Sequence, residues 1–405
     1  MQSIREIYKV GRGPSSSHTI GPERAANYYK VAHPDAEKFQ VNLYGSLCKT
    51  GHGHGTDRVL RDTFAPKEVY VVFEDRTPEG VTHPNTMDLL AFENGEWTEP
   101  TRVLSIGGGD LIIDGEPGAI PPEIYDENSF AEITEYCRFR KIGLEEYVRI
   151  TEGEEIMDFL LSIWQRMKQT IEEGLSAEGI LPGPLQVERK AKLLFADDRA
   201  DESPEIRECL LVSAYAYAVS EQNADCGVIV TAPTCGACGV VPATLYYTQQ
   251  RHGLTDEQVA GGLAVAGLIG NVVKHNASIA GAECGCQAEI GTACAMAAAA
   301  MAQVNGLSTA QIQSAAEIAL EHNLGLTCDS ICGQVQVPCI ERNAVAAMEA
   351  INAYRLAKVV SGTERIPFDF VVRTMYETGT SMSSRFKETA EGGLARMYGR
   401  KSMRK

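Results

Sequence analysis

The sequence predicts an α+β N-terminal domain with a small mixed sheet, followed by an all-α domain. Its 405 residues exceed the roughly 250–300 residues at which one hydrophobic core stops growing, so two domains are expected. Segments rich in Val, Tyr and Phe, which are typical of strands, occur before residue 145 and nearly vanish after it. Apolar residues at helical spacing dominate from there onward. We therefore expect one domain over residues 1–148 and a second over residues 149–405.

The elements expected in the first domain follow in order along the chain. A helix is predicted from Pro22 to about Ala32, since proline is favoured in the first turn of a helix. Residues 39–47 and 68–75 are predicted strands, because they are rich in Val, Tyr and Phe. The Asn94-Gly95 pair between two apolar runs predicts a hairpin turn. Together these elements predict a mixture of helix and sheet.

The second domain is expected to be helical. Residues 144–175 carry apolar side chains at helical spacing. Three further helices are predicted to begin after the N-cap residues Ser203, Thr255 and Ser308. The apolar run AGGLAVAGLIGNVV, residues 260–273, is interrupted by glycine and is shorter than the roughly 18–20 residues that span a bilayer. We interpret it as a buried helix and expect no membrane-spanning segment.

Charge and composition exclude several classes of partner. The formal net charge is −17, whereas nucleic acid and anionic membranes are bound through basic patches. We therefore expect neither as a partner. The first residues, MQSIREIYKVGRG, lack the apolar segment of a secretory signal. Twelve cysteines without such a signal are typical of a reducing compartment, so a cytoplasmic location is expected.

Many of the cysteines gather in three loops of the second domain. The loops have the sequences TAPTCGACG, GAECGCQAEIGTAC and LTCDSICGQVQVPC, at residues 231–239, 281–294 and 326–339. Thiols from separate helix ends can converge on one metal centre, and thiolates select zinc, Cu(I) or iron–sulfur clusters. The CxxC pair of Cys235 and Cys238 is weak evidence alone, because redox pairs share this spacing. The group predicts a metal centre, although any one thiol could be buried and inert.

A polar loop near the start of the chain has the sequence GRGPSSSHTIGP, residues 11–22. Its hydroxyls and the backbone N–H groups ahead of the Pro22 helix could hold a small carboxylate. An ordinary N-cap is the alternative, although one capping residue would satisfy that need. The segment KTGHGHGTD, residues 49–57, places His52 and His54 between glycines. These histidines could serve proton transfer near pH 7, or they could cap a glycine turn.

Five motifs, taken together and in order, resemble those of one enzyme family. They are GPSSSHTIGP, GHGHGTD, TAPT.GA.G, KHNASIAGAECGCQAEIGTAC and LTCD...GQVQVPCIERNA, where dots mark positions outside the resemblance, which runs from about Gly11 to Gly393. The chain resembles the iron–sulfur-dependent L-serine dehydratases, or L-serine ammonia-lyases, in their single-chain form with a β-type domain before a catalytic α-type domain. The resemblance implies a [4Fe–4S] cluster, conversion of L-serine to pyruvate and ammonia, and a role in serine catabolism and gluconeogenesis. Dimers are common among such enzymes, so a homodimer is expected.

The resemblance also assigns roles to residues of this chain. By local motif, the cluster ligands fall on Cys286, Cys328 and Cys339. His54 matches the family's histidine and is the expected proton acceptor. The resemblance places the polar loop at the active site, which is expected between the two domains. The expected substrate-binding residues are Ser15, Ser16, Ser17, His18, Thr19, Thr56, Thr234, Lys274 and Asn276.

The chain departs from the family pattern near the expected cluster. Single-chain bacterial members typically end in a cysteine that serves as a fourth ligand, but the tail GGLARMYGRKSMRK has none. The fourth iron is therefore expected to carry water, with Cys332 as an alternative cap. Cys284 and Cys294 match no ligand position and are interpreted as buried thiols. Lys274 could offset the charge of the cluster, pair with the substrate carboxylate, or be a solvated lysine at a helix end.

Three alternative functions stay open. Cysteine and threonine also lose a β-substituent, so a cysteine desulfidase or threonine dehydratase activity could use the same site. A pyridoxal-phosphate serine dehydratase would need a lysine such as Lys387 and a glycine loop such as residues 106–110, but the lysine comes first in that family. A serine-binding sensor with structural zinc is a non-enzymatic alternative, which metal analysis would distinguish.

Overall fold

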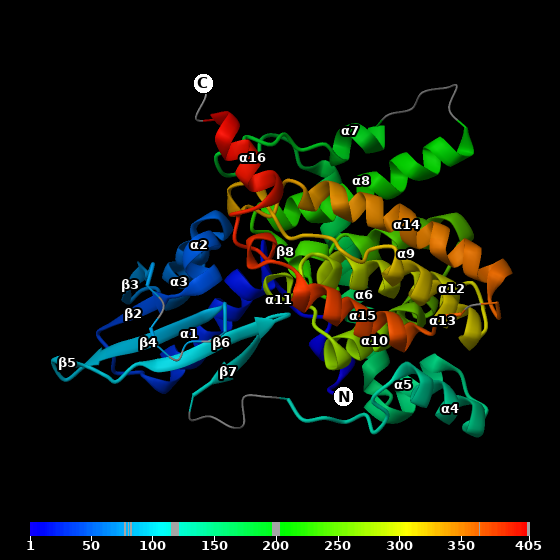
Figure 1. Ribbon diagram of the computed structural model, residues 1–405, viewed down its shortest axis with the longest axis horizontal. Helices are drawn as coiled ribbons and strands as arrows, with labels where there is room; N and C mark the ends of the chain where they lie inside the picture. The colour runs from blue at the N-terminus through cyan, green and yellow to red at the C-terminus, as the bar shows by residue number, and fades with distance from the viewer. Residues whose placement is uncertain are drawn as a thin grey trace.

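The computed structural model describes residues 1–76, 78–79, 81, 83–114, 121–196, 203–363 and 365–402. A lobe built around a β-sheet lies beside a larger body of helices (Figure 1). Most of the sheet lobe comes from early residues, and most of the helical body comes from later ones. This arrangement confirms the predicted fold class.

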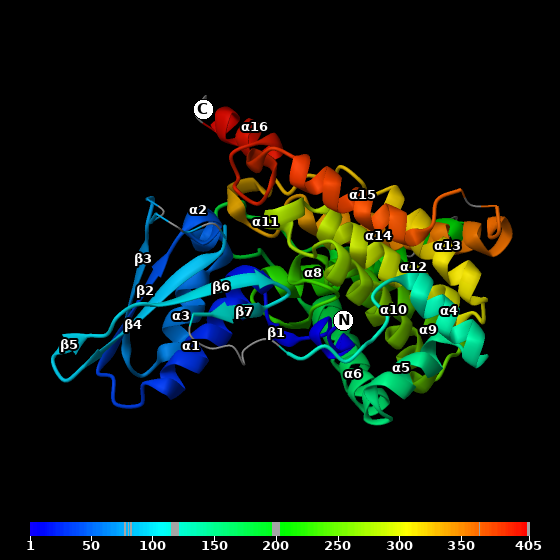
Figure 2. The ribbon, with the colours of Figure 1, turned by 60° about the horizontal axis from the view of Figure 1, so that its bottom comes forward.

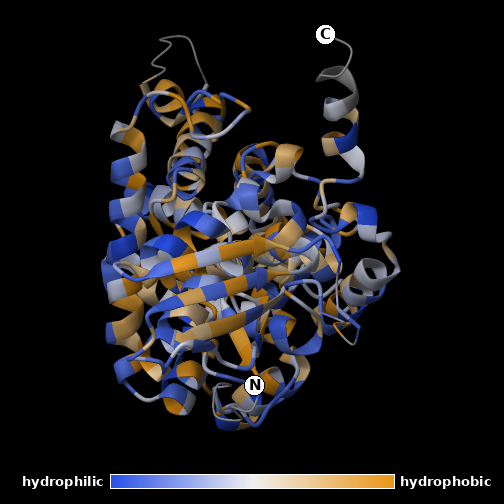
Figure 3. Ribbon diagram, turned by 90° about the vertical axis from the view of Figure 1, so that its left-hand side faces the viewer, coloured by the Kyte–Doolittle hydropathy of each residue, from blue (hydrophilic) through white to orange (hydrophobic). Residues whose placement is uncertain are grey.

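Six strands form the mixed sheet of the lobe in the order β3-β2-β4-β6-β7, with β5 paired to β4. Their bounds are Lys38–Leu43 (β2), Glu68–Phe73 (β3), Thr86–Glu93 (β4), Glu96–Trp97 (β5), Thr101–Gly107 (β6) and Asp110–Ile113 (β7). β2 and β3 are parallel, and the other neighbours are antiparallel. Hydrophobic and hydrophilic residues alternate along the strands, as expected for a sheet with one covered face (Figure 3). The predicted Asn94-Gly95 turn is confirmed between β4 and β5, where the two residues have φ values of 54° and 87°.

Three helices complete the sheet lobe: α1 (Gly21–Ala32), α2 (Gly45–His54) and α3 (Thr56–Phe64). The predicted helix over residues 22–32 is thus confirmed. The predicted strand over residues 39–47 ends early at Leu43, and the glycine turn considered for His52 and His54 is wrong. α2 runs through both histidines and ends at Gly55, whose φ of 72° is the left-handed conformation that stops a helix.

The helical body contains helices α4 to α16 around one large hydrophobic core. Their bounds are Phe130–Arg140 (α4), Leu144–Glu152 (α5), Glu155–Ser176 (α6), Ala191–Ala196 (α7), Pro204–Ala224 (α8), Val240–His252 (α9), Asp256–Asn276 (α10), Gly281–Cys284 (α11), Thr292–Val304 (α12), Thr309–Glu321 (α13), Cys339–Val360 (α14), Phe368–Ser381 (α15) and Gly393–Ser402 (α16). The predicted N-caps Ser203, Thr255 and Ser308 are confirmed. Each of these side chains accepts a hydrogen bond from a backbone N–H in the first turn of its helix.

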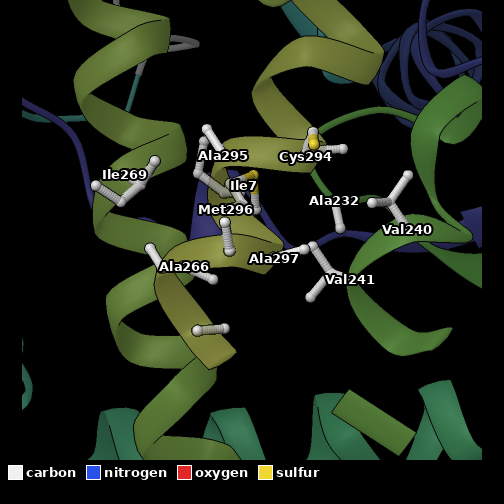
Figure 4. Packing of buried hydrophobic residues seen from close by; sticks show 14 of the residues in the cluster. Ile7, Ala232, Val240, Val241, Ala266, Ile269, Cys294, Ala295, Met296 and Ala297 are labelled. Atoms are coloured by element: carbon white, nitrogen blue, oxygen red, sulfur yellow. The ribbon is translucent and has the colours of Figure 1, made fainter. Parts of the chain in front are cut away.

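Helices α10 and α12 form the centre of the helical body. Every residue of α10 from Val259 to Val273 is buried, which confirms the predicted buried helix. α12 is rich in alanine, and its small side chains let the two helices pack closely (Figure 4). A Cβ atom on Gly262 would lie 2.7 Å from Cγ1 of Val304, so a larger residue would force Val304 to shift at this contact. Among the described residues, none of the helices combines the length and the apolar character needed to cross a membrane.

The first residues of the chain pack with the helical body. Ile4 and Tyr8 are buried in its core, and the Tyr8 hydroxyl donates to the carbonyl of Leu263 at 2.7 Å. Strand β1 (Val10–Arg12) pairs with β8 (Val228–Val230). Figure 2 shows β1 at the junction of the two parts. The large core thus draws on residues before and after position 148, which lies within α5. The division of the chain into units at that position stays a prediction.

Candidate active site

The polar loop of residues 15–19 is buried. Residues Ser16–Ile20 form a π-helical turn, a conformation frequent at functional sites, which leads directly into α1. The Ser15 hydroxyl accepts a hydrogen bond from the backbone N–H of His18 at 3.2 Å, so Ser15 is an N-cap. The Thr19 hydroxyl donates to the carbonyl of Ser15 at 2.5 Å. The loop therefore uses these two hydroxyls itself, whereas those of Ser16 and Ser17 make no hydrogen bond within the described residues.

Two buried histidines stack at this loop. The ring centroids of His18 and His54 are 4.2 Å apart, and the ring planes are inclined by 23°. Nδ1 of His54 lies 2.8 Å from the carbonyl oxygen of Thr50, which can only accept, so Nδ1 carries the hydrogen and Nε2 has a free lone pair. Nε2 of His18 lies 2.9 Å from the hydroxyl of Thr50 and 3.3 Å from that of Ser46. Helix α2 thus orients both imidazole rings.

Burial sets the protonation of the two histidines. It lowers the pKa of His54 to about 4. It also lowers the pKa of His18 well below the ordinary value, and a charge on His54 lowers it further. Both rings are therefore neutral near pH 7, and His54 presents the basic form that a proton acceptor requires.

Glu388 completes this group, although sequence reasoning did not identify it. One carboxylate oxygen of Glu388 lies 3.6 Å from Nδ1 of His18 and 3.7 Å from Nε2 of His54. The backbone N–H of Glu388 donates to the carbonyl of Cys328 at 2.8 Å, and the Ser46 hydroxyl donates to the carbonyl of Glu388 at 3.0 Å. Glu388 has a φ of 57°, and such strained positions cluster at functional sites. The segment before α16 thus carries a carboxylate from the helical body to the histidines of the sheet lobe.

The three predicted ligand cysteines lie together in the helical body. Cys286 immediately precedes a π-helical turn (Gln287–Gly291), Cys328 pairs with Lys387 in an isolated β-bridge, and Cys339 begins α14. All three are buried. Burial raises the pKa of Cys286 to about 12 and that of Cys339 to about 11. Burial raises the pKa of Cys328 as well, and the charges of Cys286 and Cys339 add to this effect because the three thiols are neighbours.

The positive charge of Arg342 lowers the pKa values of Cys286 and Cys339 and so opposes the effect of burial. Arg342 lies one turn along α14 from Cys339, and its guanidinium donates to the carbonyl of Thr327 at 2.6 Å. Burial lowers the pKa of Arg342, but negative charge on Cys286 and Cys339 outweighs this and raises it. Arg342 is thus placed to offset thiolate charge at the predicted cluster site.

Glu289 links the cysteines to the remaining site residues. The hydroxyl of Thr234 donates to its carboxylate at 2.7 Å, and the sulfur of Cys328 lies 4.0 Å from its other oxygen. Glu289 and Glu388 both contact Cys328, the first through the sulfur and the second through the carbonyl oxygen. Burial raises the pKa of Glu388, and the charge of Glu289 raises it further. The histidines, two glutamates and three thiols therefore form one continuous site between the sheet lobe and the helical body. Thr234 contacts this group through Glu289, and its role in substrate binding stays a prediction.

A pocket of about 150 Å³ reaches His54 from the surface. The sheet lobe contributes Gly53 and Arg58 to its lining, and the helical body contributes Pro182 and Gln334. A Cβ atom on Gly53 would lie 2.7 Å from the carbonyl oxygen of Cys332, so this glycine lets α2 approach the helical body. The pocket therefore lies between the two parts, where sequence reasoning expects the site.

Two predicted substrate residues lie elsewhere. Nζ of Lys274 lies 2.5 Å from the carboxylate of Asp110 and 3.0 Å from the side-chain oxygen of Gln2. The amide of Asn276 donates to the carbonyls of Asn128 and Val272. These contacts join the helical body to neighbouring segments, and the structure does not bring either side chain to the histidine–glutamate group. The position of the Lys274 side chain is explained by partial burial and by its ion pair with Asp110, and not by exposure to solvent or by contact with the histidine–glutamate group.

Other residues singled out from the sequence have distinct surroundings. Thr56, a predicted substrate residue, is buried at the start of α3, and its hydroxyl has no hydrogen-bond partner among the described residues. Cys332, the alternative fourth ligand, is exposed. The sulfur of Cys294 lies 3.3 Å from the carbonyl of Ala346, and burial raises its pKa, which suits a buried thiol. Cys284 is buried in the same way.

A buried neutral imidazole that lines a pocket between two structural parts and lies beside a carboxylate is typical of an enzyme active site. Comparison with known protein families assigns each part of the chain. Residues 3–62 match the family described as serine dehydratase beta chain, and residues 78–395 match serine dehydratase alpha chain. The chain belongs to the serine dehydratase family, which confirms the resemblance found in its motifs.

Curated relatives match over nearly the whole length of the chain. L-serine dehydratase 2 of Escherichia coli is 38% identical, over 98% of each chain. The L-serine dehydratase of Haemophilus influenzae is 39% identical, over 98% of this chain and 99% of the relative. That of Streptomyces coelicolor is 39% identical, over 97% and 98% respectively. The order of the two parts is therefore shared with single-chain relatives.

Proposed function

We propose that the protein converts L-serine to pyruvate and ammonia by β-elimination of water, in serine catabolism and gluconeogenesis. The observation that carries this proposal is the position of neutral His54, in one site with Glu388 and three buried cysteines. The names of the relatives support L-serine as the substrate. A cytoplasmic homodimer stays a prediction from the sequence.

The donor set fits a [4Fe–4S] cluster better than a single zinc ion. Three cysteine ligands suit a cluster with one iron left for substrate. Tetrahedral zinc with Zn–S bonds of about 2.3 Å would hold its sulfurs roughly 3.8 Å apart. Among the described residues, the only group of three or more His, Cys, Asp or Glu ligand atoms that lie within 4.8 Å of one another is His18, His54 and Glu388. The three sulfurs are thus too widely spaced for one ion.

Cys286, Cys328 and Cys339 would hold the cluster, with Arg342 offsetting the charge of the thiolates. When bound there, a [4Fe–4S] cluster would supply a Lewis acid that polarises the substrate hydroxyl. The other requirements of the reaction fall on the protein's own side chains.

His54 is the proposed proton acceptor. Its Nδ1–H bond to the carbonyl of Thr50 fixes the tautomer, so the lone pair of Nε2 faces the interior of the site. Nε2 takes the α-proton of L-serine as the hydroxide leaves the β-carbon, and this proton converts the hydroxide to water. The resulting aminoacrylate becomes an imine, which water hydrolyses to pyruvate and ammonia. We propose that the hydroxyls of Ser16 and Ser17 hold the substrate carboxylate, since neighbouring hydroxyls are already used.

Anaerobic purification followed by iron, acid-labile sulfide and pyruvate assays tests this function. We expect iron and sulfide in equal amounts, and pyruvate from L-serine. L-threonine would instead give 2-oxobutanoate, and L-cysteine would give sulfide with pyruvate, so faster release from either would change the assigned substrate. Zinc without iron or sulfide, and no turnover, would support the sensor alternative. A yellow Schiff-base absorbance would support pyridoxal phosphate. In the structure, Nζ of Lys387 donates a hydrogen bond to the carbonyl of Thr380.

A further inference from the structure

We propose that Glu388, with Glu289 beside it, forms the subsite that binds the α-ammonium group of the substrate. This inference rests on the proposed function and deepens it, because it explains how the site selects an amino acid over a hydroxy acid with the same carboxylate and hydroxyl. Three observations carry it: the position of Glu388 relative to the base, the lack of a lysine or arginine ion pair within the described part of the chain, and the way the backbone holds the residue.

The position of Glu388 suits an ammonium ligand. The α-proton and the ammonium group are attached to the same carbon, so the group that binds the ammonium must lie close to the base. Nε2 of His54 and a carboxylate oxygen of Glu388 are 3.7 Å apart. A substrate whose α-proton faces Nε2 can therefore present its ammonium to this oxygen at an ordinary hydrogen-bond length of about 2.8 Å.

Glu388 and Glu289 lack a lysine or arginine partner among the described residues. Among the residues that the structure describes, Glu388 makes ion-pair contacts only with the two buried histidines, which are neutral near pH 7. The Thr234 hydroxyl donates a hydrogen bond to the carboxylate of Glu289. Other carboxylates nearby are already paired, such as Asp329 with Arg342. The charge of Arg342 acts on Glu289, but among the described residues no lysine or arginine pairs with Glu388, so an ammonium group supplies the positive charge that this buried carboxylate lacks.

The backbone holds Glu388 in place from both parts of the protein. Cys328 in the helical body accepts its N–H at 2.8 Å, and Ser46 in the sheet lobe donates to its carbonyl at 3.0 Å. Its φ of 57° is unfavourable for a residue with a side chain, so the fold tolerates strain here to orient one carboxylate. The side chain is 11% exposed, in contrast to Glu391, which is 49% exposed and pairs with Lys49. Glu391 is therefore a matched control on the same segment.

The test compares L-serine with 3-hydroxypropanoate, which has the same carboxylate and β-hydroxyl but no ammonium group. With the anaerobic holoenzyme, we expect Glu388→Gln to raise the KM for L-serine at least about 30-fold, the effect of losing about 2 kcal/mol of charge pairing. The inhibition constant of 3-hydroxypropanoate should change less than about threefold. Glu391→Gln should change neither value. Glu388→Asp, which keeps the charge, should recover part of the affinity for L-serine.

Two outcomes overturn the proposal. Equal losses of affinity for L-serine and 3-hydroxypropanoate would mean that Glu388 shapes the site in general. An unchanged KM for L-serine would mean that Glu388 does not contact the ammonium group. Calorimetric binding of both ligands to His54→Gln holoenzyme, with and without Glu388→Gln, gives the same comparison without turnover. A wild-type protein that binds L-serine more tightly than 3-hydroxypropanoate but forms no pyruvate would contradict the proposed function and not the subsite. If Glu388→Gln fails to fold, Glu388→Asp and Glu289→Gln provide the comparison.

Discussion

The imidazole rings of His18 and His54 stack 4.2 Å apart, although one ring comes from the turn before α1 and the other from the end of α2. Both side chains are buried, so a positive charge on one ring opposes protonation of the other. The stack therefore keeps a neutral base next to a carboxylate. This relationship motivates the first two predictions.

Replacing His54 should remove the base while leaving the substrate able to bind. We expect His54→Gln to lower kcat for L-serine by about 10²–10⁴, the usual contribution of general acid–base catalysis, with a much smaller change in KM. His52→Gln is the matched control, because His52 lies on the same helix but is exposed and stacks on Phe73. Steady-state kinetics of the two variants measure this difference. Equal kcat values for them would exclude His54 as the proton acceptor.

The pH dependence of stability should report the buried base. Burial lowers the pKa of His54 from 6.5 to about 4, so between these values the unfolded chain binds a proton that the folded chain does not. The free energy of unfolding should therefore fall as the pH drops through this window, by up to about 1.4 kcal/mol per pH unit for this histidine. Thermal unfolding of wild type and His54→Gln between pH 7 and about 5 measures the difference. We expect the variant to lose less stability, and parallel curves would contradict the assignment.

The three ligand cysteines should be distinguishable from the other buried thiols. Serine at position 286, 328 or 339 removes a thiolate, so Cys286→Ser, Cys328→Ser and Cys339→Ser should each lose most of the iron, the sulfide and the visible absorbance. Cys294→Ala is the control, because this buried thiol faces the carbonyl of Ala346. It should keep the cofactor at a cost of about 1 kcal/mol in stability. Cluster loss in the control alone would require a different ligand set.

Cys332→Ala tests the alternative fourth ligand. The Cys332 side chain is exposed, so we expect this variant to keep the resting spectrum of the wild-type protein unchanged. A shift of the cluster absorbance or of its electron paramagnetic resonance signal would show that Cys332 caps the fourth iron.

Rapid loss of activity in air is also expected, because an iron without a protein ligand is readily oxidised and lost.

Lys274 should act in stability rather than in substrate binding. Asp110 is almost fully buried and contacts both Lys9 and Lys274. Asp110→Asn leaves two partly buried lysines without their partner and should destabilise the protein by about 3–5 kcal/mol. Lys274→Met should lower the unfolding temperature while leaving the KM for L-serine within about twofold. A large rise in KM without a change in unfolding temperature would restore the substrate role predicted from the sequence.

Local patterns predicted the elements whose structure depends on neighbours in the chain. The N-cap residues Ser203, Thr255 and Ser308 start helices because a side-chain oxygen satisfies a backbone N–H only a few residues away. The Asn94-Gly95 turn is confirmed for the same reason. The glycines around His54 were misleading, because Gly53 lets α2 pack against the helical body, which no local pattern reveals.

The site was predictable only in part. Arg342 follows Cys339 by one helical turn, and Glu289 follows Cys286 closely, so both could have been singled out once the cysteines were assigned as ligands. Nothing in the sequence around Glu388 distinguishes it from the exposed Glu391 on the same segment. Lys274 and Asn276 were assigned to the substrate from their place beside a ligand loop, yet their partners come from distant segments.

The sequence by itself determined the family, the order of the sheet lobe and the helical body, and the types of residue that the chemistry requires. These properties follow from hydrophobic periodicity and from motifs whose members are close in the chain. Only the tertiary structure decided that Glu388 meets His54, that Ser15 and Thr19 serve their own loop, and that Lys274 pairs with Asp110. The physical reason is that burial and charge pairing depend on which surfaces pack together, and packing joins residues that are far apart in sequence.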